Sequence, residues 1–307
     1  MQDNRSPWIL VPCSLLLIVV AGCGGGGGGT GESLSAQYQR AMKIADPESR
    51  VIQLLQVADK QHKAGDSIGR EKSLVSAADA ANSIKDAGGR ATALNRVGMT
   101  TARMNQPYEA KKILRDVQKM LGEVEDPEAK VALLTRMGYT YGKYLSEPGE
   151  AEDMLARAEQ TAREVARPEG RIEALLEVAY TRYGLGQENE TRQLLDQTLA
   201  GARGLEDVRK RADALASAGA ILSKMKKTDE CKALFQEAQD TAAEISDPLS
   251  QAYSYVHLST ALIESDRKGE AQKVLELAEA SADKVTDQSM RGPLMDKIYA
   301  TRRQTTS

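Results

Sequence analysis

The chain has 307 residues, with 41 lysines and arginines against 44 acidic residues, and its formal net charge is −3. This near-neutral balance argues against a nucleic-acid-binding protein, because such a protein needs a basic excess to neutralise phosphates. The 3 cysteines are too few for a disulfide scaffold, and 1 tryptophan and 1 phenylalanine leave few large side chains for a thick globular core. The composition favours a thin, helix-rich architecture built on alanine and leucine.

The first predicted element is an apolar run from Trp8 to Val20. It is too short to cross a hydrocarbon core of about 30 Å as a helix, and Pro12 interrupts it. A short apolar run near the N-terminus is typical of a signal peptide, although the segment before it carries little positive charge. We predict a signal peptide over residues 1–22. Because no other long apolar run follows, the sequence does not predict a polytopic membrane protein.

The run leads into Val20-Ala21-Gly22-Cys23, which resembles a bacterial lipobox. The resemblance implies that a dedicated peptidase cuts before Cys23 and that this cysteine carries several acyl chains, which anchor a protein firmly where one chain binds marginally. It also implies sorting to an outer membrane, if the organism has one, because Gly24 and not an aspartate follows the cysteine. The alternative is a plain secretory signal with an incidental cysteine.

Residues 23–36 are predicted to form the lipidated cysteine and a glycine-rich tether. The glycine run from Gly24 to Gly29 has no side chains to bury and maximal backbone freedom. It matches the glycine spacing of a phosphate-binding loop, but no strand precedes it and no lysine–serine pair follows it. We therefore expect a flexible connection and no nucleotide site.

An internal repeat governs the rest of the chain. Its marker is an aspartate that recurs about every 40 residues, at Asp46, Asp86, Asp126, Asp207, Asp247 and Asp287, with Arg167 in the intervening place. The step to Arg167 is one residue longer, and we place the extra residue in the turn Leu145-Ser146-Glu147-Pro148. Each period has helix breakers at its middle and no alternation of period two, so it predicts two helices and no strand.

The helices have recognisable starts and buried faces. In Asp46-Pro47 the aspartate can accept from the first-turn N–H groups, and a proline at the first helical position loses no hydrogen bond. Leucine recurs at one position of each helix, and a column of glycine or alanine in the first helix allows two backbones to approach closely.

Met137-Gly138 in one first helix, with Ala151, Leu155 and Ala158 in the second, resembles the tetratricopeptide repeat. The period exceeds the family's length of about 34 residues, which we attribute to a longer second helix. The resemblance implies an all-α fold, an α-solenoid of about six 40-residue helix-turn-helix repeats plus a terminal helix. We place this solenoid at residues 37–303 and a disordered tail at 304–307.

The resemblance further implies that a partner binds on a concave face lined by the first helices. The residues that it places on this groove are Asn95, Met99, Arg103, Tyr139, Lys143, Tyr180, Tyr183 and Tyr253. Tyrosine suits such a surface because its ring is apolar and its hydroxyl is polar. We expect Tyr141 and Tyr144 to fill gaps between repeats instead. The lysine–asparagine pattern with which some family members hold a C-terminal carboxylate is missing, so chaperone-tail binding is not expected.

A basic residue recurs four positions after the anchor, at Arg50, Arg90, Lys130, Arg171, Arg211 and Arg291. One hypothesis is a basic ladder for an acidic ligand. The favoured alternative is an ion pair with the anchor aspartate one helical turn earlier, as in Asp46 and Arg50, because a cation in the first turn of a helix is unfavourable without a partner.

The sequence predicts no enzyme, no cofactor and no metal site. His62 and His257 have no second ligand at metal-binding spacing, and Cys231 occupies a small packing position. We therefore expect a lipid-anchored protein of the cell envelope that acts as a protein–protein interaction scaffold, with a protein or peptide partner and no nucleic acid. The alternative is a periplasmic or secreted carrier that binds a small ligand or a glycan.

Overall fold

The structure, a computed structural model, describes residues 32–306. Within this range the chain consists of α-helices and their connections, with one 3-10 turn and no strand. The predicted all-α class is therefore confirmed. The expected signal peptide over residues 1–22, the lipidation site Cys23 and the glycine run lie outside the described residues. None of the helices in the described range is both long and apolar enough to cross a membrane.

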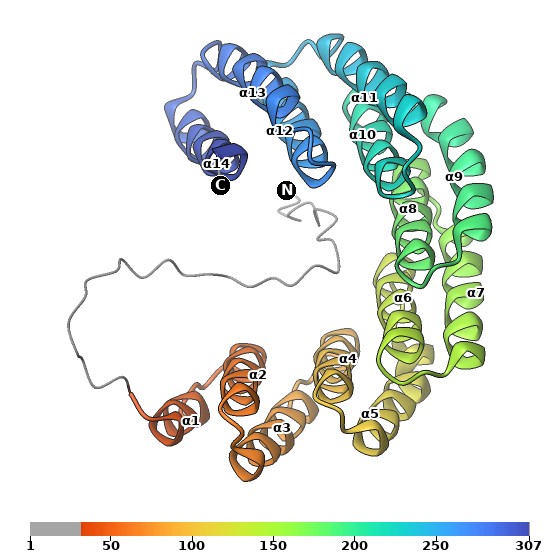
Figure 1. Cartoon of the computed structure of the whole chain (residues 1–307). Helices are drawn as coiled ribbons and strands as arrows, with labels where there is room; N and C mark the ends of the chain where they lie inside the picture. Colours follow the sequence, from red (N-terminus) through yellow and green to blue (C-terminus); the bar gives the residue numbers. More distant parts are fainter. Residues whose placement is uncertain (1–31, 307) are drawn as a thin grey trace. The chain divides into compact units, whose positions relative to one another are not determined.

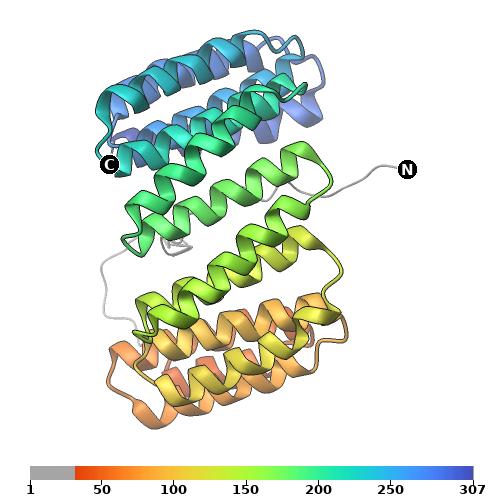
Figure 2. The same ribbon diagram turned by 90° about the vertical axis from the view of Figure 1, so that its right-hand side faces the viewer.

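Every predicted repeat contains its two helices. The first helices are α2 (Pro47–Lys63), α4 (Ala87–Arg103), α6 (Pro127–Lys143), α8 (Pro168–Gly184), α10 (Val208–Lys224), α12 (Pro248–Glu264) and the terminal α14 (Gln288–Thr306). The second helices are α3 (Ser67–Asn82), α5 (Pro107–Met120), α7 (Pro148–Glu164), α9 (Glu188–Arg203), α11 (Thr228–Ala243) and α13 (Lys268–Ala282). The 3-10 turn Leu121–Glu123 follows α5, and α1 (Leu34–Met42) precedes the first repeat. Figure 2 shows the long helices of the hairpins from the side.

The contacts divide the chain into two compact units, Met1–Met154 and Leu155–Ser307, and the division falls inside α7. Within a unit, a first helix packs against its hairpin partner and against the first helix of the next hairpin, as α10 does with α11 and α12. In each unit of Figure 1 the first helices form one layer and the second helices form another. Each unit is a stack of tetratricopeptide-like hairpins, as the predicted α-solenoid requires.

The anchor aspartates cap the first helices, as predicted. The Asp46 carboxylate accepts a hydrogen bond of 2.8 Å from the Ser49 N–H, and the Asp247 carboxylate accepts one of 2.8 Å from the Ser250 N–H. These bonds satisfy N–H groups that have no partner inside the helix. Arg167 occupies the same position at the start of α8 without a side-chain cap, and Pro168 begins that helix.

Each turn between the two helices of a hairpin contains one residue in the left-handed backbone region. These residues are Gly65, Asn105, Ser146, Gly186, Lys226 and Asp266, with φ of 74°, 60°, 56°, 81°, 59° and 57°. Glycine adopts this conformation readily, asparagine and aspartate tolerate it, and other residues are strained there. The extra residue of the third repeat lies in such a turn, which places Ser146 one position later in its repeat than its counterparts.

The small column of the first helices marks where two backbones approach closely. A Cβ atom added to Gly98 would lie 3.0 Å from Leu114 Cδ2, and one added to Gly219 would lie 2.7 Å from Phe235 Cε1. Leu114 itself is fully buried. The packing predicted from these columns is therefore present, and the close approach leaves little room for a side chain at either glycine.

Both ends of the solenoid extend beyond the predicted boundaries. The tether was expected to reach residue 36, but α1 begins at Leu34, because the Ser33 side chain accepts from the Ala36 N–H and caps the helix. The tail at 304–307 was expected to be disordered, but α14 continues through Thr306. Thr305 is buried there, and its hydroxyl accepts from Gln272 of α13, so the neighbouring hairpin holds this segment in the helix.

Four of the six recurring basic residues, and Gln251 in the place of the missing one, cap the end of the preceding helix, whereas Arg291 pairs with Asp283. The capping side chains reach back to the end of the preceding helix and donate to its free main-chain carbonyls. The pairs are Arg50 with Ile44, Arg90 with Ile84, Arg171 with Val165 and Arg211 with Leu205, and Gln251 does the same with Ile245. Within the described chain none of these residues forms an ion pair with its anchor aspartate, although the charge of Arg50 contributes to the lowered pKa of Asp46. The acidic-ligand ladder stays a prediction.

Candidate interaction surface

The exposed side of the first helices carries most of the residues that the sequence placed on a binding groove. We call this side the first-helix face, and we describe it separately in the two units. In the N-terminal unit it includes Gln56, Asp59 and Lys63 of α2, Arg96, Met99 and Arg103 of α4, and Arg136, Tyr139 and Lys143 of α6. In the C-terminal unit it includes Tyr180 and Tyr183 of α8, Arg209, Asp213 and Lys224 of α10, Tyr253 and His257 of α12, and Lys297 of α14.

Asn95 does not belong to this face. Its side chain is fully buried, and its amide donates a hydrogen bond of 3.0 Å to the main-chain carbonyl of Leu133 in α6. A side chain without solvent access offers no contact to a partner, so the structure contradicts its predicted role in binding. Asn95 instead joins two neighbouring first helices, and the next residue, Arg96, reaches the surface.

Arg103 takes part in an ion-pair network that links two hairpins of the N-terminal unit. Its guanidinium lies 3.0 Å from a carboxylate oxygen of Asp59, and Lys63 lies 2.7 Å from the other oxygen. Burial opposes ionisation of this carboxyl, but the hydrogen bond from Lys63 and the charge of Arg103 hold the pKa of Asp59 below its usual value. Arg103 is thus oriented by Asp59, and its side chain stays partly exposed.

Arg96 and Arg136 are the functional candidates that the sequence analysis missed. They occupy the same position in consecutive first helices, and within the described chain neither guanidinium makes a hydrogen bond or an ion pair. Burial and the positive charge of Arg136 lower the pKa of Arg96, while Glu48 opposes this shift. Two arginines that repel each other and that form no ion pair make a surface that suits an anionic group.

Tyr139 lies three residues after Arg136 and therefore on the same side of α6. Its ring packs edge-on against Tyr144, with the ring centroids 5.8 Å apart. Tyr139 is half-buried, Lys143 is exposed one turn later, and Met99 is half-buried on α4. Tyr141 is buried, which confirms its expected packing role. The N-terminal unit thus combines aromatic, apolar and basic groups on one face.

In the C-terminal unit, Tyr183 and Tyr180 both contact Lys224. The Tyr183 hydroxyl donates a hydrogen bond of 2.5 Å to the main-chain carbonyl of Lys224, near the end of α10. The Lys224 ammonium lies 5.7 Å from the centre of the Tyr180 ring, within the range of a cation–π interaction. Tyr183 therefore has a structural hydrogen bond, whereas the half-buried ring of Tyr180 offers the better contact area.

Tyr253 lies between two cations from neighbouring first helices. The Arg209 guanidinium is 5.6 Å and the Lys297 ammonium 5.4 Å from the centre of its ring. Asp213 is the nearby anion, 3.7 Å from Arg209, and it also accepts a hydrogen bond of 2.8 Å from Ser254. Burial and the charge of Arg209 lower the pKa of Lys297, which Asp213 opposes. The sequence identified Tyr253 but not the two cations beside it.

His62, His257 and Cys231 each make an ordinary hydrogen bond within the described chain. His257 shares a hydrogen bond of 3.0 Å with Ser217, and His62 lies 3.1 Å from Arg70. Cys231 is buried, and its thiol donates to the main-chain carbonyl of Thr228, as expected of a packing residue. Among the described residues, no group of histidine, cysteine and acidic side chains is arranged to hold a metal ion.

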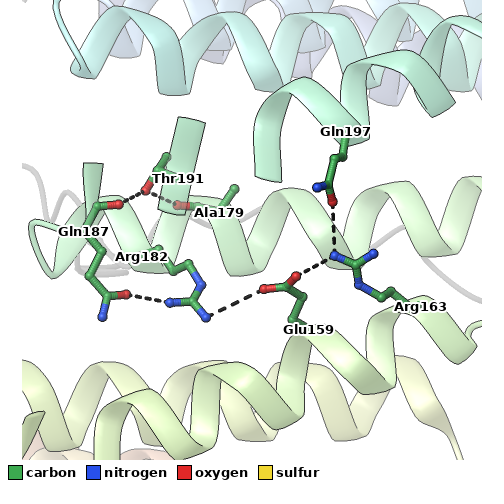
Figure 3. A network of polar contacts seen from close by, with 7 residues as sticks. All are labelled: Glu159, Arg163, Ala179, Arg182, Gln187, Thr191 and Gln197. Atoms are coloured by element: carbon green, nitrogen blue, oxygen red, sulfur yellow. Dashed lines mark hydrogen bonds and ion pairs between the residues drawn. The ribbon is translucent and has the colours of Figure 1, made fainter. Parts of the chain in front are cut away.

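A small polar pocket lies between α7, α8 and α9 of the C-terminal unit. Arg182 is buried beneath it, donates to the Gln187 amide oxygen at 2.9 Å and lies 3.6 Å from Glu159. Glu159 also accepts from Arg163 at 2.6 Å, and Arg163 donates to Gln197 at 3.1 Å (Figure 3). The cavity volume is about 110 Å³, and Glu190 and Gln193 complete its polar lining.

No protein-family model matches the chain, and no curated protein matches it by sequence. Several solved structures are similar to the chain. Ton1535 from Thermococcus onnurineus NA1 is 12% identical, with 85% of this chain and 94% of that chain covered and a TM-score of 0.41. A putative kinesin light chain with TPR-like repeats from Podosopora anserina is 20% identical, with 67% and 100% covered and a TM-score of 0.40. A Rap protein crystallised with competence and sporulation factor is 13% identical, with 89% and 80% covered and a TM-score of 0.41.

Proposed function

We propose that this chain is a lipid-anchored cell-envelope protein that acts as a protein–protein interaction scaffold through its first-helix faces. The observation that carries the proposal is the pair Arg96 and Arg136, which occupy the same position in consecutive first helices and form no ion pair within the described chain, although the charge of Glu48 acts on Arg96. Such a pair is unfavourable in the isolated protein, and an acidic segment of a partner would relieve the repulsion. The partner we propose is therefore a protein or peptide that presents acidic side chains.

The aromatic residues of the same faces supply the second element of recognition. A half-buried tyrosine offers a large and rigid contact area with little loss of conformational entropy, and Tyr139, Tyr180 and Tyr253 are of this kind. Each of them lies within one helical turn of a basic residue or beneath its cation. We expect these tyrosines to dominate the affinity and the basic residues to control the association rate and its salt dependence.

The anchor is proposed from the sequence alone. The apolar run that ends at Cys23 supports attachment through an acylated cysteine, and Gly24 supports an outer-membrane location. Cys23→Ser is expected to block processing or to release the protein from membranes. A Cys23→Ser protein that is processed normally and stays with membranes after a high-salt wash would show that the lipobox proposal is wrong.

The alternative of a carrier for a small ligand finds weaker support. The pocket above Arg182 has a volume of about 110 Å³, well below the roughly 300–1,000 Å³ of ligand pockets. Its lining is mostly polar, whereas ligand pockets are lined mainly by apolar side chains. The proposed scaffold therefore uses the first-helix faces and not this pocket.

The scaffold proposal is tested by affinity capture from envelope membranes followed by mass spectrometry. The double variant Arg96→Gln with Arg136→Gln should lose its specific partner at physiological salt. The control is Arg115→Gln with Lys119→Gln, which removes the same charge from the exposed side of α5 and should retain the partner. If both double variants capture the same proteins as the natural chain, the arginine pair is not the binding surface.

A second pair of variants separates binding from folding. Tyr139→Ala with Tyr180→Ala should abolish capture, at a cost of about 2 kcal/mol or more per anchor residue, and should leave the helical circular dichroism signal and the melting temperature unchanged. If the double variant loses stability and keeps its partners, these tyrosines pack the repeats. The binding surface then lies elsewhere.

A further inference from the structure

The N-terminal unit exposes two large apolar side chains at the same repeat position. Ile68 is 82% exposed and Tyr108 is 75% exposed, more than any other large apolar side chain in the described chain. Each is the second residue of a second helix, immediately after the turn of its hairpin, in α3 and α5 respectively. Neither side chain packs against the rest of the described chain. Exposed apolar side chains that lie close together mark a contact with another molecule or a membrane.

This apolar character is confined to the first two repeats. The corresponding second residues of the later second helices are Gly149, Asn189, Asp229 and Gly269. One helical turn beyond Ile68 and Tyr108, and on the same side, lie Lys72 and Lys112. Only these two repeats join an exposed apolar side chain to a lysine in this arrangement. We call Ile68, Lys72, Tyr108 and Lys112 the turn edge of the N-terminal unit.

The chain reaches the N-terminal unit from the side of this turn edge. α1 runs antiparallel to α2, because the Lys60 ammonium near the end of α2 donates a hydrogen bond of 2.7 Å to Gln37 near the start of α1. The Arg40 guanidinium of α1 lies 2.9 Å from the Glu32 carboxylate, and the described chain begins at Glu32. Glu32 therefore lies toward the end of α2, and α3 begins only a short turn later with Ser67 and Ile68.

The number of residues between Cys23 and Glu32 limits the distance between the turn edge and a lipid anchor on Cys23. Nine residues span at most about 30 Å when fully extended, and a glycine-rich segment is on average much shorter. An acyl anchor on Cys23 would therefore keep the turn edge within a few tens of ångströms of the bilayer. Under such tethering even a weak contact with the membrane is favoured, because the effective concentration of the surface is high.

From these observations we propose that the turn edge rests on the lipid bilayer, with Ile68 and Tyr108 in the headgroup region. This inference rests on the proposed lipid anchor. Tyrosine prefers the membrane interface, and a lysine beside it can reach anionic headgroups at about 1 kcal/mol per cation near such a surface. Lys72 also lies 4.7 Å from the centre of the Tyr38 ring, which places its charge next to α1.

The proposed contact has a consequence for orientation. The turn edge lies at one end of the helices α2 to α5, so the axes of these helices would stand away from the bilayer and not lie flat on it. The first-helix face of the N-terminal unit, with Arg96 and Arg136, would then face sideways along the membrane surface. A partner anchored in the same membrane could reach this face.

Tryptophan fluorescence can test this proposal without background. The 1 tryptophan of the chain, Trp8, lies in the predicted signal peptide and would be absent from the mature protein. Ile68→Trp and Tyr108→Trp each place a single reporter on the turn edge of the mature lipidated protein. The matched control is Asp229→Trp, at the same repeat position of α11 in the C-terminal unit. Each protein is incorporated into vesicles of phosphatidylcholine and phosphatidylglycerol with brominated acyl chains, which quench tryptophan only at close range.

We expect blue-shifted and quenched emission from the tryptophans at positions 68 and 108, and neither effect at position 229. A lipidated protein that floats with the vesicles but leaves all three reporters unquenched overturns this inference and leaves the anchor intact. Equal quenching at all three positions also overturns it, because the contact would not be specific. A blue shift at position 68 that depends on protein concentration without vesicles would mean that a second copy covers the patch. A chain that is not lipidated removes both the anchor and this inference.

Discussion

Arg171 donates a hydrogen bond of 3.0 Å from Nε to the main-chain carbonyl of Val165, across the connection from α7 to α8. The anchor of this repeat is Arg167 and not an aspartate, so an ion pair with the anchor cannot explain the contact. The same bond recurs in other repeats, and Gln251 makes it without any charge. The recurring residue therefore closes the end of the preceding helix, and hydrogen-bonding geometry matters more than charge.

Replacement of Arg171 tests this role. Arg171→Met keeps much of the side-chain length but leaves the Val165 carbonyl without its donor, so we expect a loss of about 1–2 kcal/mol in the free energy of unfolding. Arg171→Gln, which copies the residue at position 251, should lose much less. Urea unfolding followed by circular dichroism measures both values. Equal losses in the two variants would show that charge, and not the cap, stabilises this connection.

The contact between Gly219 and Phe235 predicts a rescue. Gly219→Ala should cost about 1–3 kcal/mol, because the new Cβ would lie 2.7 Å from the aromatic ring. Adding Phe235→Leu should restore most of the loss, since the double variant recreates the alanine–leucine combination of Ala179 and Leu195. A double-mutant cycle on the free energy of unfolding measures the coupling. Additive effects of the two substitutions would contradict a direct clash.

Lys226 is a candidate for stabilisation. Its φ of 59° is a conformation that costs a residue with a side chain about 1–2 kcal/mol, whereas Gly65 and Gly186 occupy the equivalent turns without this cost. Lys226→Gly should raise the free energy of unfolding by about 0.5–1 kcal/mol after the greater entropy of glycine in the unfolded chain is subtracted. Gly186→Ala is the control and should destabilise the protein in thermal melts. A loss of stability in Lys226→Gly, or a gain in Gly186→Ala, would refute the strain argument.

The buried charge of Arg182 predicts opposite effects on stability for two substitutions, Glu159→Gln and Arg182→Leu. Glu159→Gln weakens its ion pair and leaves the guanidinium buried, so we expect a loss of about 1–3 kcal/mol. Arg182→Leu removes the charge and introduces the residue that Leu222 and Leu262 supply at the same position, so its stability should equal or exceed that of the natural chain. Chemical unfolding separates the two cases. A strongly destabilised Arg182→Leu would mean that the network in Figure 3 contributes more than the buried apolar side chain.

The caps of the first helices predict a loss of stability in acid. Hydrogen bonds from Ser49, Ser250 and Ser289 lower the pKa values of Asp46, Asp247 and Asp287 respectively. A carboxyl whose pKa is lower in the folded state stabilises the fold above its unfolded pKa of about 3.9, and this contribution disappears as the pH falls through the lower folded value.

Unfolding midpoints measured from about pH 6 down to about pH 2 should therefore decrease below about pH 4. The triple variant Asp46→Asn, Asp247→Asn and Asp287→Asn keeps a capping side chain at each position but cannot titrate. Its midpoint should fall less steeply over this range. If the midpoint of the triple variant falls as steeply as that of the natural chain, carboxylates other than these three cause the acid sensitivity.

Local sequence rules predicted the helices well, because caps, breakers and apolar periodicity act over a few residues. They did not predict which side of a helix faces solvent to within one residue. The family register placed Asn95 on the binding face, but a shift of one residue turns a side chain by about 100°, and Arg96 is the residue that reaches the surface. The burial of Arg182 and the two cations beside Tyr253 depend on contacts between helices far apart in sequence, which no local pattern encodes.

The extra residue of the third repeat shows where this chain tolerates a change in length. It lies in the turn that contains Ser146, and α7 still begins at a proline and buries Ala151, Leu155 and Ala158. One residue added inside a helix would rotate every later side chain of that helix by about 100° and expose its apolar side. In the turn the same residue leaves the rotational phase of both helices unchanged. Loops or peptide tags inserted between the two helices of a hairpin should therefore leave the fold intact, whereas insertions within the helices should not.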